Sequence, residues 1–189
     1  YDVVKTVAPN VKSIHIPHAV NSDAFKKYDE ENVKQFAINS FGHKYDPDKF
    51  VFFWNNRNAR RKQSGSLIFW FKAFLDKVGH DKACLIMHTD AKDVHGQDLE
   101  VIIQELGLVD GEVMFSQQKV DPETLAMMYN MSDCTINVAD AEGFGLATLE
   151  SLACETPIIV SMTGGLQEQV TDGKEWFGIG LEPTSKAVI

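Results

Sequence analysis

The chain has 189 residues, of which 44% are apolar and 24% are charged, a composition typical of a soluble globular protein. Its 27 acidic and 18 basic side chains give a net charge of -9, which disfavours non-specific binding to nucleic acid or an anionic membrane. The longest apolar runs, such as 67–71, are too short to span a bilayer. The three cysteines form no CxxC pair and predict a reducing, cytoplasmic setting rather than a disulfide framework or zinc site: Cys84, Cys134 and Cys154.

The two ends of the chain indicate a fragment of a longer protein. It begins with Tyr1 rather than Met, charged residues interrupt any signal-peptide core, and it ends on the strand-like run 187–189. We interpret residues 1–25 as a segment leading in from a missing amino-terminal domain. Residues 26–189 are then one domain, truncated at its carboxy terminus.

Apolar patterns along the chain predict an α/β fold. Residues 26–49 are polar and are expected to form a loop or short helix. The expected strands then follow at 50–54, 84–87, 113–115, 135–138, 157–160 and 177–181. The expected helices between them are 67–78, 99–106, 121–131, 145–154 and a short one opening at 164–165. This alternation predicts a doubly wound, Rossmann-like parallel sheet, in which ligands bind beyond the carboxyl ends of the strands.

All the arginines of the chain lie in the loop after the first expected strand. Arg57, Arg60 and Arg61 are followed directly by Lys62, and a helix begins a few residues later. Guanidinium groups match the geometry of phosphate, and a helix amino terminus adds unpaired N–H donors. We interpret this loop as a diphosphate-binding site, with a solvated basic loop as the alternative.

The loop after the fourth expected strand combines glycines with carboxylates. Gly143 and Gly145 allow the backbone to approach a ligand closely, and Glu142 and Glu150 stand at the two ends of the motif. Six helical residues rise about 9 Å, so these carboxylates can contact opposite ends of one ligand and suit hydrogen bonding to sugar hydroxyls. Thr148 stands where a dinucleotide-binding fingerprint needs glycine, which argues against a dehydrogenase.

These segments resemble motifs of retaining GT-B glycosyltransferases, especially glycosyltransferase family 4. Glu142 and Glu150 match the family's Glu-x7-Glu motif, and Arg57 and Lys62 have the offset of its Gly-Arg-x4-Lys-Gly motif. Here Asn56 and Gln63 replace the two glycines. Two further segments, 16–21 and 164–170, resemble the family's Ile-Pro-His-Gly-Val-Asp and Gly-Gly-x-x-Glu-x-Val patterns. The four similarities occur in the right order over about residues 14–173.

The resemblance implies the carboxy-terminal, donor-binding half of a two-domain enzyme. Such an enzyme transfers a glycosyl group from a nucleoside diphosphate sugar to an acceptor with retention, without a bound metal or other cofactor. The isolated fragment would be inactive, because the acceptor-binding half is missing. The implied catalytic residues are Glu142 on the donor sugar and Arg57 and Lys62 on the diphosphate. The implied donor-binding residues are Glu150 on the ribose, the backbone of Gly143, Phe144, Gly145 and Leu146, and Ser116, Gln117 and Gln118 beside the base.

Several other patterns are interpreted as structural. The pair Asp46 and Asp48 and the acidic and histidine side chains of 88–95 are not expected to bind metal. His18 can reach the cleft but is expected to be held in a turn by its neighbours. The segment 127–129 is expected to pack in the core or against another domain. The alternative functions are a nucleotide-sugar epimerase or hydrolase of the same fold, and a non-catalytic domain that binds a nucleotide or a protein.

Overall fold

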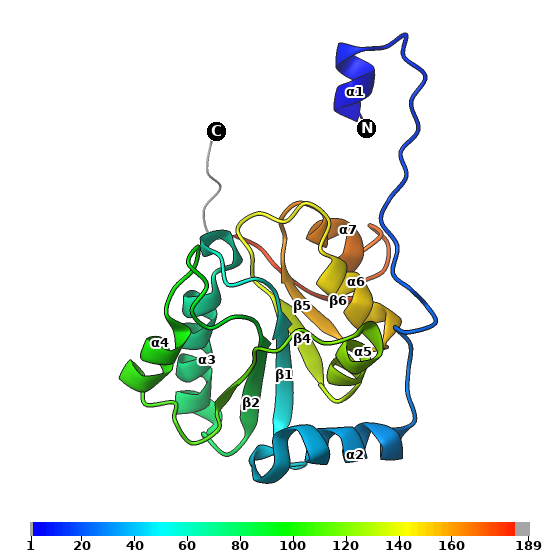
Figure 1. The fold of residues 1–189 in the computed structure, drawn as a ribbon. Helices are drawn as coiled ribbons and strands as arrows, with labels where there is room; N and C mark the ends of the chain where they lie inside the picture. The colour runs from blue at the N-terminus through cyan, green and yellow to red at the C-terminus, as the bar shows by residue number, and fades with distance from the viewer. Residues whose placement is uncertain (1, 184–189) are drawn as a thin grey trace.

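Six parallel strands form one sheet in the computed structural model, which describes residues 2–183 of the chain (Figure 1). The strands are β1 Phe50–Asn55, β2 Ala83–His88, β3 Val113–Ser116, β4 Cys134–Asn137, β5 Ile158–Ser161 and β6 Gly178–Leu181. Their order across the sheet is β3-β2-β1-β4-β5-β6. The α/β, doubly wound fold predicted from the sequence is therefore confirmed, and each expected strand is present within two residues of its predicted ends.

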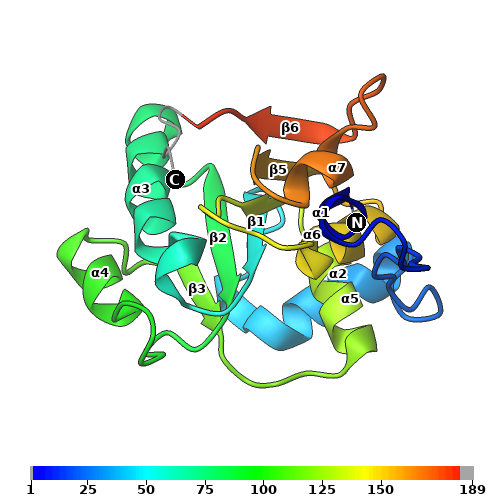
Figure 2. The same cartoon turned by 90° about the horizontal axis from the view of Figure 1, so that it is seen from above.

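Helices cover both faces of the sheet (Figure 2). The helices are α1 Asp2–Val7, α2 Glu30–Phe41, α3 Ser64–Val78, α4 Leu99–Glu105, α5 Pro122–Asn130, α6 Leu146–Ala153 and α7 Leu166–Val170. Two short 3₁₀ helices are η1 Gly42–Lys44 and η2 Arg60–Lys62. Helices α3 and α4 pack on one face, and α2 and α5 on the other. Among residues 2–183, no helix has both the length and the apolar character needed to cross a membrane.

The helices α3 and α5 show the stop and start signals that the sequence predicts. Gly79 ends α3 with a φ of 111° and donates its N–H to the Leu75 carbonyl. Asp121 caps α5 by accepting from the Thr124 N–H at 2.7 Å, and Pro122 follows in the first turn. These signals work because glycine tolerates positive φ and because an acid satisfies a free N–H group.

The segment 26–49 was the weakest part of the prediction. It contains the 12-residue helix α2 instead of a loop or a short helix, capped by Asp29 through the N–H groups of Glu31 and Asn32. Its apolar pattern is faint because Ala37 alone is fully buried among its residues, while Val33 and Phe36 pack only partly against the core. The helix α1 was also not predicted.

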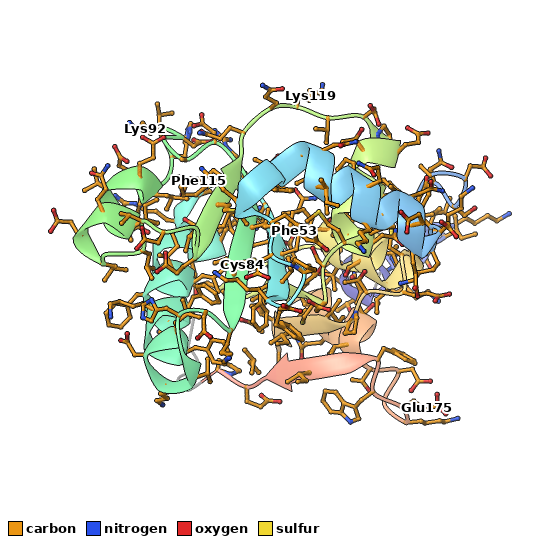
Figure 3. All side chains as sticks on the ribbon, turned by 90° about the horizontal axis from the view of Figure 1, so that it is seen from below. Phe53, Cys84, Lys92, Phe115, Lys119 and Glu175 are labelled. Atoms are coloured by element: carbon orange, nitrogen blue, oxygen red, sulfur yellow. The ribbon has the colours of Figure 1, made fainter. Side chains whose placement is uncertain are left out.

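The strands are apolar on both faces because each side of the sheet has its own core. Phe52 and Trp54 of β1 point toward α3, whereas Val51 and Phe53 join the core under α2 and α5. The view from below shows Phe53 and Cys84 in the middle of the molecule, next to α2 (Figure 3). Lys92, Lys119 and Glu175 lie at its rim (Figure 3).

The amino-terminal segment runs from α1, which is set apart from the sheet, down the side of the domain to α2 (Figure 1). Ile14 and Ile16 are exposed in it, but Ala24 and Phe25 are buried in the core beside α5. Packing against the domain therefore begins before residue 26. The strand-like run expected at 187–189, and with it the carboxy-terminal end of the domain, lies outside the described residues.

Candidate functional site

The strand order creates a crevice between β1 and β4. From β1 the chain continues outward to β2 and β3, and from β4 it continues in the opposite direction to β5 and β6, so the loops after β1 and β4 diverge. A cavity of about 330 Å³ lies at this point. This switch-point cavity is lined by His18, Asn55, Asn56, Lys62, Glu142, Phe144, Gly145, Leu146, Ala147 and Glu150.

Lys62 is a buried cation at one side of the switch-point cavity. Its ammonium forms an ion pair with the Glu142 carboxylate and donates to Asn56 Oδ1 at 2.6 Å. Burial lowers the pKa of Lys62, while the hydrogen bond to Glu142 acts in the opposite direction. Lys62 and Glu142 therefore meet in one cavity, and Asn56 joins them although it stands where the family motif has glycine.

Glu150 reaches the same cavity from α6 and is held by two further side chains. The Tyr129 hydroxyl donates to Glu150 Oε2 at 2.7 Å, and Asn55 Nδ2 donates to the Tyr129 hydroxyl at 2.8 Å. Burial raises the pKa of Glu150, and it raises the pKa of Tyr129 well above its usual value. Tyr129 therefore keeps its proton at neutral pH and acts as the donor. It packs in the core as predicted, but its bond to Glu150 was not foreseen.

The two glycines of the Glu142–Gly145 loop have different roles. Gly145 has a φ of 87°, and a Cβ there would lie 2.6 Å from Leu166 Cδ2, so no other residue fits without strain. Gly143 has open space around its Cα and lines a neighbouring hollow with Arg61 instead of the switch-point cavity. Of the predicted loop residues, Phe144, Gly145 and Leu146 line the cavity.

The four cations after β1 do not gather around one point. Arg57 forms a two-pronged ion pair with Asp93, with Nε 2.6 Å from Oδ2 and Nη2 3.1 Å from Oδ1, and it lies outside the cavity. Arg61 donates to the Ala141 carbonyl at 2.7 Å. Arg61 Nη1 also lies 3.8 Å from Glu142 Oε2, the carboxylate oxygen that Lys62 contacts, so two of the four cations meet at Glu142. In the described part of the chain, Lys62 alone of the four lines the cavity. A role of Arg57 on a diphosphate stays a prediction.

The predicted base-binding residues lie beyond β2, at the end of β3. Ser116, Gln117 and Gln118 line a separate groove of about 940 Å³ along this edge of the sheet. Ser116 Oγ lies 2.9 Å from His88 Nδ1, and the Gln117 side chain accepts from the Ala91 N–H at 3.2 Å. Burial lowers the pKa of His88, so its ring is neutral at physiological pH. The groove runs along β3 from residues before the strand, such as Gly111, to Ser116, Gln117 and Gln118 at its carboxyl end.

His18 and the two asparagines are the lining residues that sequence reasoning underestimated. The His18 ring meets the Phe144 ring edge-on at a centroid distance of 5.0 Å, so His18 reaches the cavity from the amino-terminal segment. Its expected confinement to a turn was wrong. Asn55 ends β1 and Asn56 follows it, and their position at the carboxyl end of a strand was the signal that could have identified them. Among residues 2–183, no group of three or more His, Cys, Asp or Glu side chains is arranged to hold a metal ion.

Comparison with known proteins adds independent findings. The family described as "Glycosyl transferases group 1" matches residues 37–187. The D-inositol 3-phosphate glycosyltransferase of Acidothermus cellulolyticus is 33% identical over 84 residues, which are 44% of this chain and 18% of that protein. The chain thus spans less than a quarter of the length of the curated relatives it matches.

Two solved structures share the fold. The sucrose-phosphate synthase (tll1590) from Thermosynechococcus elongatus superposes with a TM-score of 0.73 at 24% identity, over 97% of this chain and 43% of that one. Anabaena Alr3699/HepE in complex with UDP-glucose superposes with a TM-score of 0.69 at 18% identity, over 87% of this chain and 42% of that one.

Proposed function

Since the chain belongs to the family of group 1 glycosyl transferases, we propose that it is the donor-binding domain of a retaining glycosyltransferase. In this proposal it binds a nucleoside diphosphate sugar, and a separate amino-terminal domain of the intact protein supplies the acceptor site. The UDP-glucose complex of the structurally similar Alr3699/HepE supports a donor of this class. We also propose a cytoplasmic location, which the three free, buried cysteines support.

The observation that carries this proposal is the placement of two carboxylates and one cation in a single cavity. Glu142 and Glu150 line it together with Lys62. A nucleoside diphosphate sugar carries hydroxyls on its sugar and on its ribose, with two negative phosphates between them. In our proposal Glu142 accepts from the sugar hydroxyls, Glu150 accepts from the ribose hydroxyls, and Lys62 contacts the diphosphate.

The reaction breaks the bond between the anomeric carbon of the sugar and the diphosphate oxygen. Negative charge then develops on the diphosphate, and a buried cation stabilises it more strongly than a solvated one. We assign this stabilisation to Lys62, in place of a metal ion. Arg57 shares it once the Arg57 side chain leaves Asp93. The amide N–H groups of residues 143–146 lie at the start of α6, where a helix favours anions. The base then lies toward Ser116, Gln117 and Gln118.

Calorimetric titration of the 189-residue chain with UDP and UDP-glucose, and with the matching guanosine and adenosine pairs, tests the proposal. Glu150→Ala should weaken the diphosphate and its sugar equally, because both contain ribose. Glu142→Ala should reduce the gain in affinity that the sugar brings, because Lys62, released from its ion pair, stays available to the diphosphate of both ligands. Each lost hydrogen bond to a charged group is expected to cost about 1.5–3 kcal/mol. Glu168→Ala, an exposed acid on α7, is the control. Absence of binding by every pair would refute the proposed function.

A further inference from the structure

Helix α7 and the turn before it contact the backbone of the Glu142–Gly145 loop. The Gly165 N–H donates to the Glu142 carbonyl at 3.1 Å, and Thr163 Oγ1 donates to the Asp140 carbonyl at 3.0 Å. Gly164 has a φ of 49°, and a Cβ there would collide with the Glu142 carbonyl oxygen. The backbone of this turn and that of the loop are therefore in direct contact.

Gln169 makes the innermost of these contacts. Its side chain is 8% exposed, and its Nε2 donates to the carbonyl of Phe144. Its Oε1 is buried and has no hydrogen-bond partner within the described residues. An unsatisfied buried amide oxygen destabilises the folded state, and the neighbouring α7 residues Leu166 and Val170 show that this face packs well with apolar side chains. Packing alone therefore does not account for glutamine at this position.

The contact with Phe144 sets the direction of the next amide. A trans peptide bond is planar, so its carbonyl and its N–H point in opposite directions. With the Phe144 carbonyl turned toward Gln169, the N–H of Gly145 points away from α7. It is in no hydrogen bond within the described residues, and Gly145 itself lines the switch-point cavity. Within the described residues this N–H is therefore an unpaired donor on a loop that lines the switch-point cavity.

We propose that Gln169 is a positioning residue of the donor site: through the Phe144 carbonyl it directs the Gly145 N–H at the sugar of the donor. The inference rests on the proposed function and adds to it a residue that touches no ligand. It predicts that Gln169 affects the gain in affinity that the sugar brings, while the binding of the nucleoside diphosphate alone is nearly unchanged.

The test uses the 189-residue chain and the ligand pair that the wild type binds most tightly. Gln169→Leu should reduce the ratio of sugar-bearing to sugar-free affinity by about three- to tenfold, the range of one net hydrogen bond. Gln167→Leu, on the exposed side of the same helix, should leave this ratio unchanged. A wild-type ratio in a folded Gln169→Leu chain would overturn the inference.

Gln169→Glu supplies a second measurement, the pH dependence of the affinity ratio, which a purely structural role of Gln169 would not change. Its carboxylate cannot donate to the Phe144 carbonyl, but the protonated acid can, and burial favours the protonated form. The affinity ratio should therefore recover, relative to the wild type, as the pH falls from about 8 to about 5. Gln167→Glu should show no recovery. Equal pH profiles for the two variants would overturn the inference, whereas absence of binding by the wild type would refute the proposed function itself.

Discussion

Tyr129 determines where the Glu150 carboxylate lies, because it bonds both Glu150 and Asn55 through one hydroxyl. Tyr129→Phe should leave these two partners without that bond and lower the free energy of unfolding by about 1–3 kcal/mol. It should also raise the pKa of Glu150 further, since the Tyr129 hydrogen bond acts to lower it. We therefore expect weaker binding of nucleoside diphosphates in calorimetry.

Tyr28→Phe is the matched control for this change. The Tyr28 hydroxyl donates to the Ala24 carbonyl at 2.9 Å, away from the cavity. Its loss should affect stability but leave ligand binding intact. Equal binding by the two variants would show that Tyr129 does not position Glu150.

His80 is expected to make stability depend on pH. Its ring nitrogens each lie 3.1 Å from a carboxylate oxygen, one of Asp76 and one of Glu112. The hydrogen bond to Asp76 and then that to Glu112 raise the pKa of His80 above 6.5. A pKa raised on folding stabilises the protein below the unfolded value, and this contribution is lost as the pH rises through the folded value.

The measurement is urea unfolding of the wild type and of His80→Gln between about pH 5.5 and about pH 9. The wild type should be the more stable of the two near pH 5.5, and the difference should shrink as the pH rises above about 6.5. A difference that stays constant over this range would show that the proton on His80 has no role in the link to Asp76 and Glu112.

Residue types predicted the candidate site only in part. Glu142, Glu150 and Lys62 were found because their spacing places them after strands that end at one edge of the sheet. Arg57 was grouped with them, but Asp93 comes from a distant loop that no local pattern reveals. The role of Tyr129 as a partner of Glu150 could not be predicted, since the hydroxyl and the carboxylate meet only through the packing of α5 against α6.

At the level of elements, the turn before α7 is the one that shapes the Glu142–Gly145 loop. Gly164→Ala should impose both positive φ and a collision with the Glu142 carbonyl. Gly173→Ala is the matched control, because Gly173 also has positive φ, at 87°, but open space for a Cβ. The control should lose about 1–2 kcal/mol of unfolding free energy from backbone strain. Gly164→Ala should lose more, and the sugar contribution to affinity should fall with it.

Urea unfolding and calorimetry of the same two variants check this expectation. Equal losses of stability would mean that the loop moves aside at no cost. The turn would then not restrain Glu142.

The strands were predictable as elements, whereas α2 was not. A strand covered on both sides, such as β1, is a continuous apolar run that stands out in the sequence. Helix α2 covers the edge of one core and buries Ala37 fully, so its apolar pattern stays close to that of a solvated segment.

For the whole molecule, the sequence predicts a parallel sheet but not which strands are neighbours. Alternating strands and helices fix the class of fold, and several strand orders satisfy the same alternation. The pairing of β1 with β4 at Phe52 and Cys134 depends on contacts across the two cores. That pairing places the starts of the two diverging loops side by side, so Lys62 from one loop reaches Glu142 on the other.

The same pairing has a consequence for the order in which the chain folds. Val51 donates to the Asp133 carboxylate at 2.7 Å across 82 residues, whereas only the short η2 and the helix α3 lie between β1 and β2. Closing the longer loop costs more chain entropy, so the contact between β1 and β4 forms after contacts that are closer in sequence. We therefore expect β1, β2 and β3 to assemble first and the β4–β6 half to dock afterwards. Because Lys62 belongs to the first half and Glu142 to the second, nucleotide-binding competence should return only with the last step of refolding.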